Sequence, residues 1–216
     1  MTCKLCHQDV DAFYDEHMQC QTYHCTSCEF IFKDPNAIVS LDKELKVYKQ
    51  HNNSEENLGY VAMFQEFMEK TFLPYRKQIT TVLDFGSGPN PVLAKVMQKE
   101  GFDVAYYDKF FSPQKVYENK QYDLITSTEV IEHIADIHEV MELFSKHLHP
   151  NGYLALMTQF HTNNIDEYLT WWYRRDPTHI SFFRPHTFKL LAKEFGFILL
   201  YHDEKKLILL QKSSIL

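Results

Sequence analysis

Thr81-Val-Leu-Asp-Phe-Gly-Ser-Gly-Pro-Asn-Pro91 is the stretch of the chain that decides its fold. Its apolar first half predicts a buried strand over residues 80–85. Gly86 and Gly88 then predict a tight turn, whose backbone can approach a ligand because no side chain stands in between. Pro91 suits the first turn of a helix, since the amide hydrogen that proline lacks would be unpaired there. This order of elements favours a nucleotide-type site, although many ordinary turns also contain Gly-x-Gly.

The composition describes an acidic protein with enough apolar residues for one large domain. The chain has 216 residues, 44% of them hydrophobic and 15% aromatic, which is sufficient for one α/β domain and a small appendage. Its 22 Lys and Arg against 29 Asp and Glu give a net charge of −7, which argues against nucleic acid or an anionic membrane as the main partner. The polar N-terminal residues and the absence of an apolar run near ~20 residues lead us to expect a cytoplasmic protein with no membrane segment.

All five cysteines lie within the first 28 residues, and four of them form two pairs. Cys3-x-x-Cys6 and Cys25-x-x-Cys28 have the spacing of a zinc ribbon, in which each pair directs two thiolates at one ion. Four thiolates leave no open coordination position, so we expect a structural Zn²⁺ in a small module over residues 1–33.

The remaining features of the module bear on its ligands and its partner. Cys20 is expected to be a packed or free thiol, while His7 and His24 are weaker alternative ligands and disulfides are a weaker alternative to the metal. Residues 1–34 hold 2 lysines and 6 acidic residues, a balance of −4, which would repel phosphates. A cap that faces a substrate or a partner therefore fits better than a nucleic-acid-binding finger.

Residues 34–78 are expected to form a helical bridge or cap. Ser54 has the character of an N-cap, and the apolar spacing that follows predicts a helix over residues 54–73, which Pro74 would end. The polar residues just before this helix, which can line a site, are Tyr48, His51, Asn52 and Asn53.

Strand and helix patterns alternate over residues 79–216, which predicts a doubly wound, Rossmann-like α/β sheet. The expected strands are 80–85, 102–107, 122–127, 153–159, 197–203 and 206–211, and the expected helices are 91–100, 134–148 and 185–195. Two residues separate the last two strands, so the final strand must be antiparallel to its neighbour. Residues 109–120 are irregular, and residues 160–185 form a long aromatic insertion.

Three stretches of this α/β region resemble class I S-adenosylmethionine-dependent methyltransferases. They are Val82-Leu-Asp-Phe-Gly-Ser-Gly88, Tyr122-Asp-Leu-Ile-Thr-Ser-Thr-Glu-Val-Ile-Glu-His-Ile134 and Asp176-Pro-Thr-His-Ile-Ser-Phe-Phe183. The resemblance covers roughly residues 75–216, and the cysteine pairs ahead of it resemble small bacterial methyltransferases with an N-terminal zinc module. A nicotinamide-binding Rossmann domain is the main competitor, but it usually needs a third glycine where this chain has Pro91.

The resemblance implies a binding site for S-adenosylmethionine at the carboxyl ends of the strands. The residues that it places there are Asp84, Phe85, Gly86, Ser87, Gly88, Asp108, Lys109, Thr128 and Glu129. Asp108, at the end of the second strand, would accept hydrogen bonds from both ribose hydroxyls. Asp84 would stabilise the ammonium group of the cofactor or orient the glycine turn.

Two histidines are candidates for a catalytic base, namely His133 and His179. A second interpretation stays open beside this one. Glu129, Glu132 and His133 are spaced i, i+3 and i+4, which would place them on one face of a helix, and with His179 they can bind a divalent cation.

The sequence therefore predicts a methyltransferase that acts on a small-molecule acceptor and carries a structural zinc ion. The acceptor atom, whether oxygen, nitrogen or carbon, stays open, as does the oligomeric state. The alternatives are an RNA or protein methyltransferase that docks through the zinc module, and a non-catalytic cofactor-binding protein with the same fold.

Overall fold

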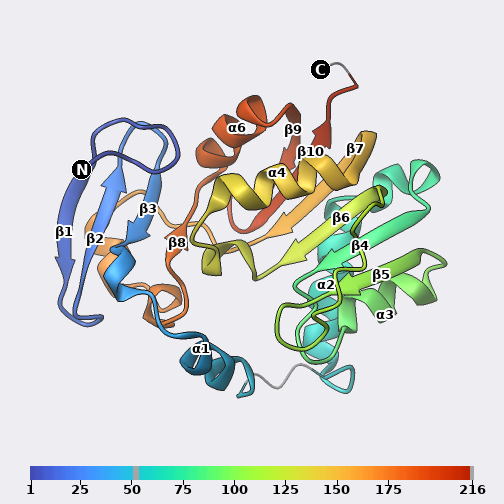
Figure 1. Cartoon of the computed structure of the whole chain (residues 1–216), viewed down its shortest axis with the longest axis horizontal. Helices are drawn as coiled ribbons and strands as arrows, with labels where there is room; N and C mark the ends of the chain where they lie inside the picture. The colour runs from blue at the N-terminus through green and yellow to red at the C-terminus, as the bar shows by residue number, and fades with distance from the viewer. Residues whose placement is uncertain (51–53, 215–216) are drawn as a thin grey trace.

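The computed structural model describes residues 1–50 and 54–214, and two β-sheets organise them (Figure 1). The larger sheet has the strand order β5-β4-β6-β7-β10-β9. Its strands are β4 (Thr81–Phe85), β5 (Asp103–Tyr107), β6 (Tyr122–Thr128), β7 (Leu148–Met157), β9 (Phe197–His202) and β10 (Leu207–Lys212). The first four in the spatial order are parallel, and β10 is antiparallel to both β7 and β9. The predicted α/β sheet with a reversed last strand is confirmed.

Helices cover both faces of this sheet because its central strands are apolar on both sides. The helices are α2 (Leu58–Lys70), α3 (Val92–Lys99), α4 (Ile137–His147) and α6 (Pro185–Glu194). In β4, Val82 packs into the core formed with α2 and α3, whereas the next residue, Leu83, packs into the core formed with α4 and α6. Successive side chains of a strand point to opposite faces, so one short strand contributes to both cores.

Two predicted helices begin later than the sequence indicated. The helix expected over residues 54–73 is α2, whose N-cap is Asn57, because the Asn57 side chain accepts a hydrogen bond from the amide of Tyr60. The helix expected over residues 134–148 is α4, which begins after Asp136 for the same capping reason. The residues just before α4 form a separate 3₁₀ turn, η3 (Ile131–His133).

The connection before β7 and the connection between β5 and β6 both have an unusual structure. Strand β7 begins at Leu148 instead of residue 153. Residues 150–152 lie inside it, where Asn151 has φ of 64° and the register with β6 is irregular. Residues 109–121 form turns with neither helix nor strand, as the sequence predicted, so β5 is the edge of the sheet.

The smaller sheet joins the N-terminal residues to the aromatic insertion, which the sequence did not predict. It consists of β1 (Asp11–Asp15), β2 (Cys20–Cys25), β3 (Phe30–Lys33) and β8 (Ser181–Phe182), in that order. Strand β8 comes from the insertion and pairs with β3, with Ile31 opposite Phe182 (Figure 1). The N-terminal module therefore shares its sheet with a segment that lies about 150 residues later in the chain.

The remaining elements are short and lie around these two sheets. They are η1 (Pro35–Ala37), α1 (Leu41–Tyr48), η2 (Leu73–Gln78), α5 (Ile165–Thr170) and η4 (Tyr173–Arg175). None of the helices in the described part of the chain combines the length and apolar character that crossing a membrane requires.

Candidate active site and cysteine cluster

A cavity of about 470 Å³ lies at the carboxyl ends of β4, β5 and β6. Every residue that the sequence assigned to the cofactor lines it: Asp84, Phe85, Gly86, Ser87, Gly88, Asp108, Lys109, Thr128 and Glu129. The two predicted catalytic histidines, His133 and His179, line the same cavity. Its volume falls in the ordinary range for small-molecule and cofactor sites, about 300–1,000 Å³.

The glycine turn after β4 is fixed by its own backbone and by a neighbour. Gly86 and Gly88 have backbone φ angles of 87° and 67°, which residues other than glycine rarely adopt. A Cβ atom on Gly86 would also come within 2.3 Å of the Val130 side chain, so glycine is required there by packing as well as by backbone conformation. The amides of Gly86 and Ser87 both donate to the carbonyl of Tyr107, which ties the turn to the end of β5.

Asp108 follows β5 and is held by backbone amides. One carboxylate oxygen accepts from Gly88 N at 2.9 Å, and the other accepts from Phe110 N and Phe111 N at 2.8 and 3.0 Å. A carboxylate has about four lone-pair positions, so three of them are used and one remains. The expected contact of Asp108 with the cofactor stays a prediction, and these bonds leave room for one hydroxyl donor without rearrangement.

Asp84 is held differently, because it is 2% exposed and lies beneath the turn. It accepts a hydrogen bond from the Thr126 hydroxyl at 2.9 Å. Burial raises the pKa of Asp84 to about 7, although the bond from Thr126 opposes this shift. A cationic group bound nearby would favour its ionised form.

Glu129 lines the cavity and Glu132 is fully buried, and the two do not share a helical face as predicted. Glu129 has φ of 54°, which excludes it from a helix, and Glu132 lies in the η3 turn. The hydroxyl of Tyr173 contacts both, at 2.9 Å from Glu129 Oε2 and closely at Glu132 Oε1. Burial raises the pKa of both carboxyl groups, that of Glu132 furthest, because the Glu129 charge adds to its burial.

His133 and His179 come together although 46 residues separate them in the sequence, and their ring centroids are 4.6 Å apart. Nδ1 of His133 is 3.1 Å from the carbonyl of Thr178, and Nδ1 of His179 is 2.8 Å from the carbonyl of Tyr173. A carbonyl only accepts, so both Nδ1 atoms carry the proton and both Nε2 atoms present a lone pair. Burial lowers the pKa of His133 to about 4 and that of His179 to about 3, so both rings are neutral near pH 7.

Glu132, His133 and His179 form a compact group of potential metal ligands. Each offers one ligand atom, and these atoms lie within 4.8 Å of one another. Glu132 is fully buried, and its Oε2 has no hydrogen-bond partner among the described residues. Glu129, which the sequence placed with this group, is not part of it.

Several further residues line the cavity that the sequence did not assign to it. Phe64 belongs to the apolar helical spacing and was expected to be a core residue, and no role was expected for Tyr60, Tyr107, Phe111 or Asp176. The i, i+4 spacing of Tyr60 and Phe64 at the start of α2 was the available signal, but it is also the spacing of a core face. Tyr48 lines the cavity as expected, whereas His51, Asn52 and Asn53 lie outside the described residues.

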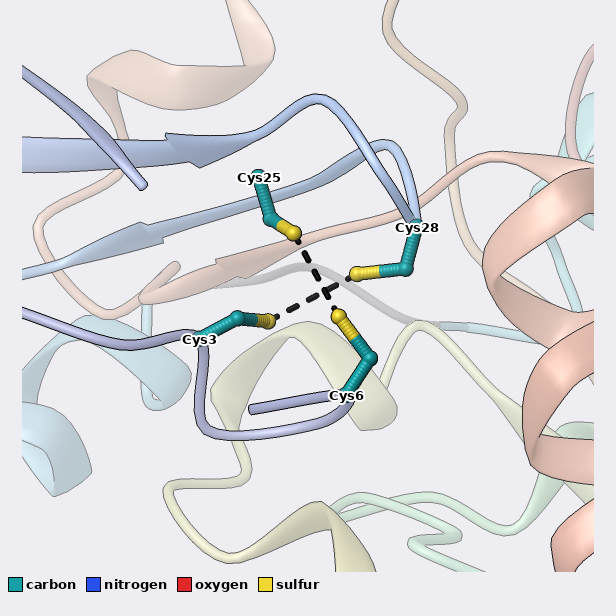
Figure 2. Close-up of side chains that lie close together, drawn as sticks. All are labelled: Cys3, Cys6, Cys25 and Cys28. Atoms are coloured by element: carbon teal, nitrogen blue, oxygen red, sulfur yellow. Dashed lines mark hydrogen bonds between the residues drawn. The ribbon is translucent and has the colours of Figure 1, made fainter. Parts of the chain in front are cut away.

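The four paired cysteines converge on one point, as Figure 2 shows. The sulfur atoms of Cys3 and Cys28 are 3.5 Å apart, and those of Cys6 and Cys25 are 3.4 Å apart. These separations exceed the ~2.05 Å of a disulfide bond, and all five cysteines are free. A tetrahedral Zn²⁺ with bonds of ~2.3 Å places its sulfur ligands about 3.8 Å apart, so the donor set and its spacing fit this ion.

The thiols do not ionise together easily without a cation. The hydrogen bond from Cys28 lowers the pKa of Cys3 to about 5, whereas burial raises that of Cys6 to about 11. A divalent ion binds thiolates, so it would stabilise the ionised form of all four cysteines together. Cys20 and His24 lie outside the group, Cys20 as a buried free thiol and His24 bonded to Asn163, and His7 is not part of it either.

Comparison with known proteins relates this arrangement to methyltransferases. A family model described as a methyltransferase domain matches residues 59–202. No curated protein matches the sequence.

Solved structures resemble the fold at low sequence identity. An O-methyltransferase family protein from Burkholderia thailandensis is 14% identical, with 82% of this chain and 68% of that chain covered and a TM-score of 0.50. DesVI from Streptomyces venezuelae is 11% identical, with 81% and 99% covered and a TM-score of 0.54. The mitomycin 7-O-methyltransferase MmcR is 11% identical, with 78% and 60% covered and a TM-score of 0.51. At these identities the likeness is one of fold.

Proposed function

Since this chain belongs to the methyltransferase-domain family and is an S-adenosylmethionine-dependent methyltransferase, we propose that it methylates a small-molecule acceptor. The observation that carries the proposal is the cavity at the strand ends, which is lined by both the glycine turn and the candidate acceptor-side groups. Its roughly 470 Å³ must accommodate the cofactor and the reacting part of the acceptor, which favours a small molecule over a polymer.

The residues around the cavity fit the parts of the cofactor. When bound, S-adenosylmethionine supplies an electrophilic methyl group on a positively charged sulfur. Asp84 and Glu129 provide negative charge for its cationic groups, and Asp108 has a free acceptor position for a ribose hydroxyl. Phe85, Tyr107 and other aromatic residues provide apolar surface for its ring system.

The test is the transfer of a labelled methyl group from S-adenosylmethionine into three separate pools, namely a metabolite extract, total RNA and a protein extract. We expect label in the metabolite pool, and the Asp108→Ala variant serves as the control for cofactor-dependent labelling. Label confined to RNA or protein would overturn the small-molecule assignment. Binding of the cofactor with no label in any pool would support a non-catalytic binding protein instead.

We infer further that Glu132, His133 and His179 bind a divalent cation instead of serving as a general base. A base needs a pKa near the working pH, whereas burial holds both imidazoles well below it. Neutral imidazoles whose Nδ1–H groups donate to backbone carbonyls have the arrangement of metal-ligating histidines. The unpartnered Glu132 oxygen adds a carboxylate, and two histidines with one carboxylate suit a first-row transition ion with open positions.

Metal analysis of the His179→Ala variant separates these two roles. If the three residues are ligands, the variant contains about one ion fewer per chain than the wild type, and methyl transfer depends on an added divalent cation. If His179 is a base, the metal content stays unchanged and transfer falls without cation dependence. A His149→Ala variant, which alters an exposed histidine outside the cavity, is the matched control.

We also propose that the cysteine cluster binds a structural Zn²⁺, which the donor set and sulfur spacing support. Four thiolates persist only where the compartment keeps them reduced, and this requirement is consistent with the cytoplasm.

A further inference from the structure

The aromatic insertion is attached to the N-terminal sheet by a buried lysine. Lys33, the last residue of β3, is 4% exposed. Its ammonium group donates to the carbonyl oxygens of Arg174 at 3.1 Å and Asp176 at 3.2 Å. These carbonyls lie in and just after the η4 turn, so one side chain of the N-terminal module holds the turn at two points.

A second buried contact joins the same turn to the same module. Arg174 is within 2.9 Å of Asp15 at the end of β1, and both side chains are almost completely buried. Arg174 also donates to the carbonyl of Tyr168, which connects the turn to α5. Together with the pairing of β3 and β8, these bonds place the insertion on the N-terminal sheet at several positions.

The segment held in this way carries part of the cavity wall. Tyr173, Asp176 and His179 all line the cavity. The segment also supplies the carbonyl groups that orient both imidazoles, because His179 donates to Tyr173 and His133 donates to Thr178. The glycine turn and Asp108, by contrast, are held by β4, β5 and their loops, which do not contact Lys33 through any hydrogen bond of the described residues.

We propose that Lys33 is a positioning residue of the acceptor site, through which the cysteine-bearing module sets the orientation of His133 and His179. The proposal rests on the proposed function, since it assigns these histidines to the acceptor side of a methyltransferase cavity. It implies that the integrity of the module governs the acceptor side, whereas the glycine turn and Asp108 keep their own support from β4 and β5. A lysine fits this task because its three donors reach two carbonyls at once, and no ion pair of the described residues engages it.

The experiment compares Lys33→Met with Lys212→Met. Lys212 also donates to two backbone carbonyls, those of Ser145 and Leu148, which lie in α4 and at the start of β7. Both variants lose the same kind of bonds, so general destabilisation affects both. The first readout is amide hydrogen exchange over residues 168–183. The second is the fluorescence emission of Trp171 and Trp172, which are the two tryptophans of the chain. The third is the calorimetric affinity for S-adenosylhomocysteine.

For Lys33→Met we expect exchange over residues 168–183 to rise at least about tenfold and the tryptophan emission to shift, while the affinity changes by less than about threefold. Long-range ¹H–¹⁵N spectra should show His133 and His179 losing the exclusive Nδ1–H form. Lys33→Arg should restore these signals because it keeps the donors, and Lys212→Met should leave them unchanged. Cys25→Ser removes a ligand of the cysteine cluster and leaves Glu132, His133 and His179 unchanged, so it should reproduce the Lys33→Met pattern.

Unchanged exchange, emission and histidine spectra in folded Lys33→Met would overturn the proposal, as would an equal loss of cofactor affinity. If Lys33→Met does not fold, the same readouts are taken on Lys33→Gln, which keeps a donor but no charge. A wild-type protein that binds no S-adenosylhomocysteine would contradict the proposed function alone, since the exchange and spectral readouts need no cofactor.

Discussion

Asp84 and Asp108 are two carboxylates at neighbouring strand ends that the fold holds in opposite ways. Asp108 accepts three backbone amides, which stabilise its charge. Asp84 is buried with the Thr126 hydroxyl as a partner, and its pKa rises from 3.8 to about 7. The sequence placed both residues at the cofactor site but gave no sign of this difference, because it depends on which groups surround each carboxylate.

The raised pKa of Asp84 makes stability depend on pH. The folded state binds more protons than the unfolded state between pH 3.8 and about 7, so the free energy of unfolding should fall as pH rises through this window. Asp84→Asn keeps an acceptor for Thr126 and should remove this contribution, which we place at about 1–4 kcal/mol. Urea unfolding at pH 5.5 and 8 measures it. Asp103→Asn, at an exposed position, is the control, and equal slopes in wild type and Asp84→Asn would contradict the prediction.

Asp108 should contribute directly to cofactor affinity. Asp108→Ala removes the remaining acceptor position and releases the amides of Gly88, Phe110 and Phe111. We expect S-adenosylmethionine binding to weaken by roughly 1–3 kcal/mol, the scale for hydrogen bonds to a charged group. Isothermal calorimetry measures this loss, and an unchanged affinity would mean that the ribose is held elsewhere.

At the scale of elements, α1 is held to the rest of the chain by an ion pair and by ring contacts of Tyr48 with Phe110 and His133. Glu44 is its one buried residue in the described structure, and it accepts from Lys109 at 2.6 Å and from the Tyr48 hydroxyl at 2.7 Å. Tyr48 and Lys109 both line the cavity. The ion pair therefore joins α1 to a predicted cofactor residue at the wall of the cavity.

A double-mutant cycle with Glu44→Gln and Lys109→Met tests this attachment. The Lys109 side chain is 42% exposed, so solvent screens the pair and we expect a coupling of about 0.5–2 kcal/mol in urea unfolding. Hydrogen exchange over α1 should rise in either single variant. The exposed pair of Glu66 and Lys70 is the matched control, with an expected coupling of about 0.5 kcal/mol or less. Additive single effects at Glu44 and Lys109 would show that α1 docks in another way.

The elements that the sequence predicted are those with a local signal. Every strand of the large sheet was predicted because its apolar run is bounded by turn residues. Strand β8 has only two residues and owes its existence to β3, so no local pattern could reveal it. The spacing of Glu129 and Glu132 is that of one helical face and led to a wrong prediction. The backbone of Glu129 is in the left-handed region, and the chain turns before α4 begins.

In the candidate site too, the sequence predicted the residues with a local signal and missed those that depend on tertiary structure. The residues that the sequence placed at strand ends line the cavity, because parallel strands bring their carboxyl ends to one edge, and their contacts with the cofactor stay predictions. The roles of Tyr173 and Asp176 depended on how the insertion folds back over the cavity, and this is a tertiary property.

At the scale of the whole molecule, the cysteine cluster should control the smaller sheet. Metal analysis should find about one zinc ion in the cysteine cluster. This ion should be lost in Cys25→Ser and retained in Cys20→Ser, because Cys25 is a member of the cluster and Cys20 is not. Loss of this ion should raise hydrogen exchange in β1, β2 and β3, since small modules of this size depend on such a ligand. A Cys25→Ser variant that keeps the zinc ion and the exchange pattern would reject the four-cysteine site.

The pairing of β3 with β8 also bears on how the protein is made. During translation the cysteine residues leave the ribosome before the insertion does, so the strand that completes their sheet emerges only after residue 182 has been synthesised. Until then β3 has an open edge, on which another nascent chain can pair. The N-terminal module is therefore unsuitable for fusion to another enzyme on its own. The recipient protein would have to supply a strand that replaces β8, the two-residue strand of the insertion.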